Sequence, residues 1–159
     1  MNFSLTGESK MKNRLIVLLC ILFSYSVVAK DRLEVYEDYE LGTEIMTMTT
    51  VKIDPNMGDV YLAGLRESWV KAVKIEKSLG HIKDWKIYSS DLPVSGDFNM
   101  VLIVTFDSAA DLEPSKKKYA AFMKKWSDKD KEKSEAISEK YPEVRTLAGE
   151  YRLREIIMK

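Results

Sequence analysis

The sequence is poor in the residue types on which most recognisable catalytic and metal sites depend. It holds one cysteine and one histidine among 159 residues. The cysteine, Cys20, lies in an N-terminal apolar segment that we expect to be removed, so the mature chain would have no disulfide and no thiol chemistry. No HxxxH pattern, cysteine pair or calcium-loop pattern is present, and we therefore predict no metal site. Phosphate-binding glycine loops and nucleophile elbows are absent as well.

Residues 1–29 have the layout of a secretory signal peptide. Lys10, Lys12 and Arg14 form a basic n-region, Leu15 to Phe23 is the apolar h-region, and Val27 and Ala29 occupy the small-residue positions before a cleavage point. We expect cleavage between Ala29 and Lys30 and a periplasmic or secreted mature protein, with Met11 as a possible true start. The alternative is a leader that is kept as an anchor.

The charge balance after cleavage is close to neutral. Removing the leader takes away three basic residues and one acidic residue, which leaves 22 basic and 24 acidic residues. Such a balance gives no reason to expect nucleic acid or, once the leader is gone, a membrane as partner. Composition and length fit one globular domain at residues 44–159, preceded by an arm at 30–43.

The chain after residue 43 alternates strand and helix signals in the order β-α-β-β-α-β. Strands are predicted at 44–53, 84–90, 100–106 and 144–158, and helices at about 59–79 and 114–141. Leu62, Leu65, Trp69 and Val73 form the apolar stripe of the first helix, and Gly80 is its C-terminal cap. The charged run 127–133 is predicted to continue the second helix. This order predicts an α+β, ferredoxin-like sandwich, a four-stranded antiparallel sheet with two helices on one face.

The third strand, Met100–Phe106, is apolar on both faces, although helices can cover only one of them. The other face also carries Met46 and Met48. A bare apolar face usually marks a partner, so we expect a homodimer with sheet packed on sheet. The alternative is a monomer whose arm at 31–40 folds over the open face.

The pattern resembles the dimeric α+β barrel superfamily, whose members include antibiotic-biosynthesis-type monooxygenases, stress-responsive barrels and NIPSNAP-like proteins. The resemblance covers about residues 44–158 and is strongest for secreted members near the NIPSNAP-like and monooxygenase-like groups. It is carried by the segment 51–55 (VKIDP), the helix with Trp69, the strand 82–88 (IKDWKIY), the link 96–99 (GDFN) and the ending 145–147 (RTL). The resemblance implies a shared fold that serves both enzymes and non-enzymes.

Five residues are candidates for a ligand site: His81, Trp85, Trp69, Tyr61 and Arg66. His81 would be a ligand or general base at the mouth of a pocket, or else a polar residue at a helix end. We find no carboxylate at a spacing that would orient it. Trp69, Trp85 and Tyr61 would hold a planar apolar molecule or serve as core, and Arg66 would line the rim or be solvated. Lysines 116–118 are interpreted as a solvent face.

These patterns predict a homodimer that binds a small hydrophobic or aromatic molecule, without assigning catalytic residues. A cofactor-independent oxygenase acting on an electron-rich ring, and a structural dimer without ligand, are the alternatives. We expect no cofactor, although haem ligation by His81 is conceivable in the superfamily.

Overall fold

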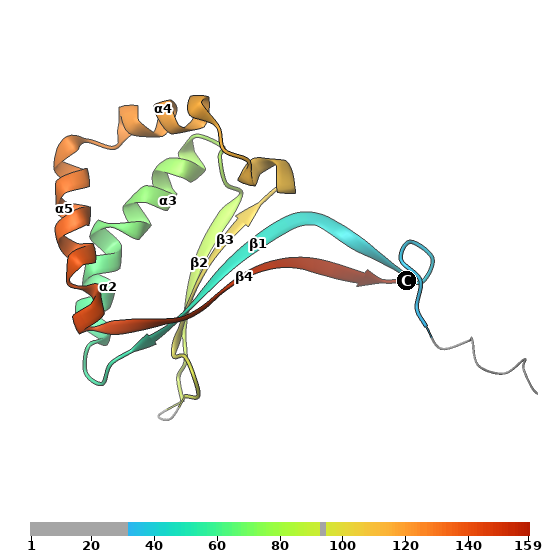
Figure 1. The fold of residues 1–159 in the computed structure, drawn as a ribbon, viewed down its shortest axis with the longest axis horizontal. Coiled ribbons are helices and arrows are strands. Elements are labelled where there is room, and N and C mark those ends of the chain that lie inside the picture. Colours follow the sequence, from blue (N-terminus) through green and yellow to red (C-terminus); the bar gives the residue numbers. More distant parts are fainter. Residues whose placement is uncertain (1–31, 93–94) are drawn as a thin grey trace, which may run out of the picture.

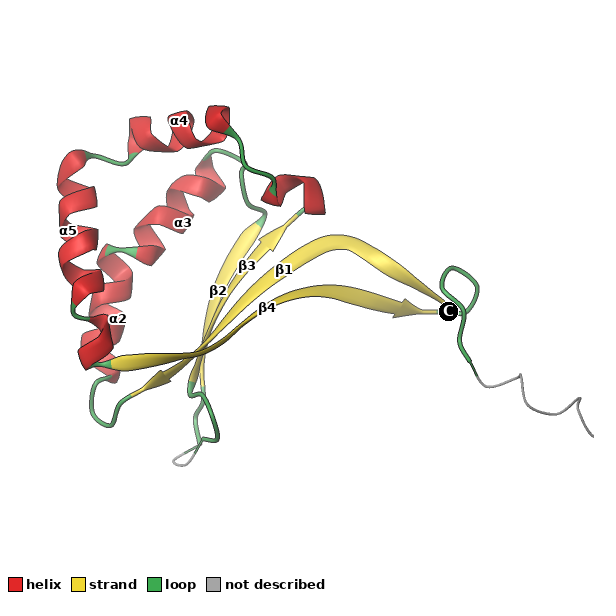
Figure 2. Cartoon of the chain, viewed as in Figure 1, coloured by secondary structure: helices red, strands yellow, loops and turns green. Residues whose placement is uncertain are grey.

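Four strands form one antiparallel sheet, and the helices lie on one side of it (Figures 1 and 2). The computed structural model describes residues 32–92 and 95–159, so the expected leader lies outside the described residues. The elements are β1 (Tyr39–Ile53), α2 (Gly58–Glu67), α3 (Trp69–Ser78), β2 (Asp84–Ser89), β3 (Met100–Phe106), the short 3-10 helix η1 (Ala109–Leu112), α4 (Lys116–Lys125), α5 (Asp128–Glu139), η2 (Tyr141–Glu143) and β4 (Arg145–Met158). Among the described residues no helix has the length and apolar character needed to cross a membrane.

The strand order β2-β3-β1-β4 confirms the ferredoxin-like sandwich predicted from the sequence. β1 and β3 are central, and Thr49 of β1 lies opposite Leu102 of β3. β2 and β3 form the predicted hairpin, with Ile87 opposite Leu102. The strand Met100–Phe106 therefore has a hydrogen-bonded strand on each side, as predicted for a central strand.

The first helical region is broken at Ser68, whereas the sequence predicted one helix to about residue 79. The Ser68 hydroxyl donates to the Gly64 carbonyl at 2.8 Å and lies 2.7 Å from the Tyr141 hydroxyl. A serine that bonds back to the carbonyl four residues earlier bends a helix, because it competes with the backbone N–H. Ser68 itself leaves the helical conformation, at φ −115° and ψ −90°.

The second helical region is also divided, and the prediction of one continuous helix through the run 127–133 was wrong. α4 ends at Lys125, and α5 begins after Ser127, whose hydroxyl oxygen accepts a hydrogen bond from the Asp130 N–H at 3.2 Å. Ser127 thus acts as an N-cap, which starts a new helix. Ser115 caps α4 in the same way, through the Lys118 N–H.

The core lies between the helices and the sheet face that they cover. Its most buried members come from β1, α2, β3 and η2: Val51, Ile53, Tyr61, Leu65, Met100, Leu102 and Tyr141. Of the predicted stripe, Leu65 and Val73 are buried and Trp69 is partly buried, but Leu62 is exposed because α2 turns it away from the sheet.

β1 begins at Tyr39, earlier than the predicted residue 44, and pairs with the end of β4 to form a two-stranded ribbon. Tyr39 lies opposite Met158 and Leu41 opposite Ile156. In Figure 1 this ribbon curves away from the helices and beyond the rest of the sheet. It continues the sheet and does not fold back over the open face, so the structure contradicts the alternative of a self-covering arm.

Candidate functional site

The end of α3 fixes the position of His81. Gly80 adopts φ +68°, a conformation that glycine reaches without strain. The His81 N–H donates to the Glu76 carbonyl at 3.0 Å, and the Gly80 N–H donates to the Lys77 carbonyl at 3.1 Å. This pair of bonds defines a Schellman motif, which brings the residue after the glycine beside the residue five positions earlier. The predicted glycine cap is confirmed, and it dictates which side chain His81 meets.

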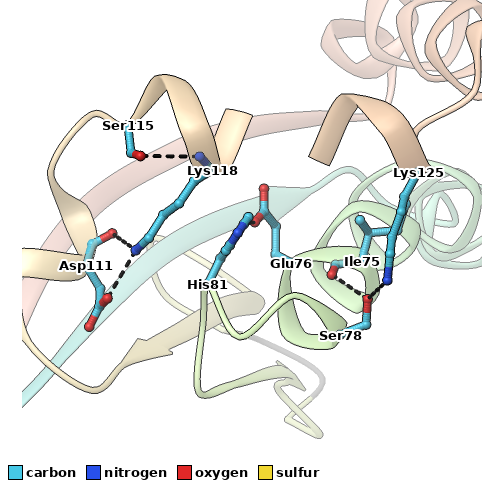
Figure 3. Close-up of polar contacts among 8 residues, drawn as sticks. All are labelled: Ile75, Glu76, Ser78, His81, Asp111, Ser115, Lys118 and Lys125. Atoms are coloured by element: carbon cyan, nitrogen blue, oxygen red, sulfur yellow. Dashed lines mark hydrogen bonds and ion pairs between the residues drawn. The ribbon is translucent and has the colours of Figure 1, made fainter. Parts of the chain in front are cut away.

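That side chain is Glu76. Its Oε2 lies 2.5 Å from the His81 Nδ1, and the imidazole is only 13% exposed (Figure 3). An ionised carboxylate can only accept, so Nδ1 donates and, in a neutral ring, Nε2 carries the lone pair. The expectation that no carboxylate orients His81 was therefore wrong. Side chains that meet along a helix are three or four residues apart, whereas the Schellman motif brings together Glu76 and His81, which are five residues apart.

A second polar pair stands on the other wall, where η1 leads into α4. Lys118 donates through Nζ to Asp111 Oδ1 at 3.0 Å and to the Asp111 carbonyl at 3.3 Å. Lys118, and after it the Ser108 hydroxyl, lower the pKa of Asp111 by hydrogen bonding to its carboxylate. Lys118 thus faces inward, and the interpretation of lysines 116–118 as one solvent face fails at this position.

The two pairs border a cavity of about 390 Å³ between the end of α3, strand β3 and the start of α4. It is lined by Val73, Glu76, His81, Ile82, Val104, Phe106, Asp111, Glu113, Ser115, Lys118 and Tyr119. Mostly apolar walls with a few convergent polar groups, at a volume of several hundred Å³, are typical of small-molecule sites. Such a cavity can hold an apolar body and orient one polar group.

Of the predicted site residues, only His81 lines this cavity. Trp69 and Trp85 meet edge to face, with ring centroids 5.7 Å apart. Trp85 lies opposite Val104 in the sheet, and Val104 lines the cavity. The tryptophan pair therefore lies beside the cavity wall and outside the lining of the cavity.

The remaining two candidates lie elsewhere. Tyr61 is 1% exposed and belongs to the core, where its ring meets that of Tyr141 at a centroid distance of 5.1 Å. Burial raises the pKa of Tyr61, an effect that the nearby Arg145 guanidinium partly offsets. The Arg66 side chain is 76% exposed and pairs with Glu67 at 3.4 Å. The structure brings neither residue to the His81 cavity.

The polar or aromatic lining residues that sequence reasoning missed include Glu76, Asp111, Glu113, Lys118 and Tyr119. Glu76 had a usable signal, because a glycine cap followed by a polar residue implies a contact back into the last turn of the helix. The other four reach the site through η1, whose short 3-10 turn has no periodic signal in the sequence.

A larger hollow of about 500 Å³ lies at the opposite end of the sheet, among loop residues that include Asn99. The Asn99 amide is already committed to the backbone, because its Oδ1 accepts from the Ile53 N–H at 2.8 Å and its Nδ2 donates to the Ile53 carbonyl at 2.9 Å. Asn99 thus joins the β3 start to the β1 end. Within residues 32–92 and 95–159, no group of three or more His, Cys, Asp or Glu side chains is placed to hold a metal ion.

The sheet face opposite the helices forms a second notable surface. The register places on it Met46, Met48, Tyr88, Val101, Ile103, Tyr151 and Leu153. Tyr88 and Tyr151 are each about half exposed, at 51% and 50%. No helix covers these side chains, and they form a mainly apolar area, which we call the open face. Lys86 of β2, opposite Ile103, lies on the same face.

Gly149 shapes one end of the open face. It lies opposite Thr50, and the next pair is Leu147 with Val51, so Ala148 is the extra residue of the predicted bulge. A Cβ on Gly149 would lie 2.8 Å from the Tyr151 hydroxyl. Glycine is therefore needed for Tyr151 to lie over this position, a packing known from aromatic residues that cover strand glycines.

No family model and no curated protein matches the chain. Solved structures with a similar arrangement include HapK from Hahella chejuensis, at 8% identity and a TM-score of 0.42, covering 70% of this chain and 91% of that chain. A dimeric ferredoxin-like protein of unknown function from Thermobifida fusca has 12% identity and a TM-score of 0.38, covering 81% and 100%. A dimeric protein of unknown function with a ferredoxin-like fold from Bacteroides fragilis has 14% identity and a TM-score of 0.38, covering 73% and 96%.

The Thermobifida fusca and Bacteroides fragilis proteins are ferredoxin-like, as the strand order of this chain is. The grouping with NIPSNAP-like or monooxygenase-like proteins stays a prediction.

Proposed function

We propose that the chain works as a homodimer whose subunits pack through the open face. The observation that carries this is the apolar area at the centre of the open face, where Met48 is flanked by Ile103 on one side and Tyr151 on the other. Specific dimers bury about 800 Å² per partner, and a four-stranded sheet face offers an area of that order. Burying it against a second copy would remove the largest apolar surface from water.

The ribbon of β1 and β4 supports the same proposal. Its apolar side chains Leu41, Ile156, Ile157 and Met158 are exposed in the single chain, as are Leu33, Val35 and Tyr36 of the segment before it. A two-stranded ribbon with nothing packed on it is marginally stable in water. Residues 39–44 extend past Ile45, the last β1 partner of β3. At about 3.4 Å per residue they span about 20 Å, and stacked sheets lie about 10 Å apart, so a second subunit on the open face is within reach.

Sedimentation of the mature protein at micromolar concentration tests this proposal. A homodimer gives twice the mature mass. A particle with the mass of one mature chain would contradict the homodimer proposal.

We further propose that each subunit binds a small hydrophobic or aromatic molecule in the His81 cavity. The observation that supports this is the Glu76-oriented imidazole in an otherwise largely apolar wall. Phe106, Val104 and Ile82 would contact the apolar body, and His81 Nε2 would meet a polar group on it.

Binding of a panel of aromatic molecules and haem, measured by calorimetry, tests the cavity. His81→Ala should weaken binding at least about tenfold, and Trp85→Ala less, since Trp85 lies beside the cavity wall and does not line the cavity. Arg66→Ala is the matched control and should leave binding unchanged. Equal effects of His81→Ala and Arg66→Ala would place the site elsewhere, and haem ligation would show as a shifted absorption band lost in His81→Ala.

A second candidate function is general-base catalysis at the same place, for example proton removal from an electron-rich ring before it meets oxygen. A base held by a third group is the arrangement that activates such chemistry. Here Glu76 would hold His81 so that Nε2 accepts the proton. Turnover of a bound aromatic substrate that Glu76→Gln slows without weakening binding would support catalysis; binding without turnover supports the binding role.

We propose that the mature protein is periplasmic or secreted. The support is the leader pattern at residues 1–29. N-terminal sequencing of protein from the native host tests it, and an intact leader on that protein would overturn cleavage between Ala29 and Lys30.

A further inference from the structure

The lining of the His81 cavity carries more negative than positive charge. Glu76, Asp111 and Glu113 contribute three carboxylates, and Lys118 contributes one ammonium group. Glu76 is engaged by His81, and Asp111 by Lys118. Glu113 forms no ion pair with any residue of the described ranges. A cleft with low-dielectric walls focuses such a field and raises the local concentration of the opposite charge.

Two aromatic rings of the same lining act in the same direction. Phe106 forms part of the sheet wall, and Tyr119, 66% exposed, stands at the rim on α4. The face of an aromatic ring attracts a cation within about 6 Å, most strongly where water is excluded.

The helix dipoles do not reverse this preference. The C-terminal end of α3, through Glu76 and His81, and the first turn of α4, through Ser115 and Lys118, both border the cavity. The partial negative charge of the first and the partial positive charge of the second oppose each other. The full charges of the side chains therefore determine the sign of the electrostatic potential in the cavity.

We infer that the ligand of the His81 cavity is a small organic cation, an amine carried on an aromatic or branched apolar body. This inference rests on the proposed binding function of the same cavity. The ammonium group would donate to Glu113 and to the outer oxygens of Glu76 or Asp111. The apolar body would lie against Val104, Phe106 and Ile82.

The test uses three probes of matched size, phenethylamine, 2-phenylethanol and phenylacetate, titrated calorimetrically into the mature protein. Phenethylamine should bind at least about tenfold more tightly than phenylacetate, with 2-phenylethanol between them. Its advantage should shrink as salt is raised, because screening weakens charge interactions. Glu113→Gln should reduce the advantage several-fold, while Glu139→Gln, on the exposed surface of α5, should leave it unchanged.

Phenylacetate or 2-phenylethanol binding as tightly as phenethylamine would overturn the cation inference and leave the ligand site standing. An advantage that Glu113→Gln does not change would overturn it too, because the cavity charge would not be its source. Failure of all three probes to bind would overturn the inference together with the proposed binding function.

Discussion

His81 and Glu76 meet through their side chains because their backbones already meet. The His81 N–H donates to the Glu76 carbonyl at 3.0 Å, and the imidazole Nδ1 lies 2.5 Å from the Glu76 carboxylate. The turn that ends α3 therefore sets the orientation of the only histidine in the sequence. The site depends on this turn, and substitutions in the turn test it.

Gly80→Ala should destabilise the protein by about 1 to 2 kcal/mol. The reason is conformational, since φ is +68° and a Cβ at this position would meet no atom within 4 Å. Gly58→Ala is the matched control, because its Cβ would also meet nothing and its φ is not positive. In urea unfolding, the free energy of unfolding of Gly58→Ala should equal that of the wild type or exceed it by up to about 1 kcal/mol. Equal losses for both variants would contradict the strained turn.

Ser68→Ala should cost about 1 to 3 kcal/mol of unfolding free energy. It leaves the buried Tyr141 hydroxyl without the partner that now lies 2.7 Å away. Tyr141→Phe should cost less, because the Ser68 hydroxyl keeps its bond to the Gly64 carbonyl. The double variant should lose about 1 kcal/mol less unfolding free energy than the sum of the two single losses. Simple additivity would show that the two hydroxyls do not interact.

Stability should fall in acid through carboxylates that are ion-paired in the fold. Hydrogen bonds from lysines lower the pKa of Asp111, Asp130 and Asp84 below the ordinary value of 3.8, the partners being Lys118, Lys71 and Lys77. A lowered folded pKa adds stability above the unfolded pKa, and this is lost as the pH falls through the folded value. Unfolding free energy should therefore hold down to about pH 4 and decline below it.

Asp111→Asn isolates one of these carboxylates. It should flatten the acid decline while lowering the unfolding free energy at neutral pH. An acid decline as steep as that of the wild type would show that Asp111 does not contribute to it.

Met48→Lys should break the proposed dimer, because it places a charge at the centre of the open face. The dissociation constant should rise at least about a hundredfold, as expected when a charge must be buried without a partner. Val60→Lys is the matched control, since Val60 is an exposed apolar residue on α2, on the helical side. Sedimentation should show a monomer for Met48→Lys and a dimer for Val60→Lys, and the reverse pattern would move the interface to the helices.

The sheet was predictable because its strands carry their own signal. Met100–Phe106 is apolar except at Thr105 and rich in β-branched residues, and Gly80 indicated the end of the first helical region. The helix breaks were not predictable, since the one at Ser68 depends on a tyrosine that is distant in sequence. Ser127 did carry a local N-cap signal, but the surrounding charges favoured one long helix.

The site was predicted only in part for the same reason. His81 stood out as a single residue, whereas Lys118 reaches the cavity only because η1 turns the chain before α4. Trp69 and Trp85 were predicted either to hold the ligand or to serve as core, and they pack edge to face outside the cavity lining. Which face a helix residue presents depends on where the preceding short turn places the helix, and a turn of four residues has too little pattern to reveal that.

The most direct test of the account uses the single histidine of the chain. The imidazole proton signals of the tag-free mature protein belong to His81 alone and can be followed by NMR while phenethylamine is added. The account predicts a saturable shift of these signals, with the same midpoint as calorimetric binding and a reduced amplitude in Glu76→Gln. Binding that saturates in the calorimeter while the His81 signals stay in place would contradict it.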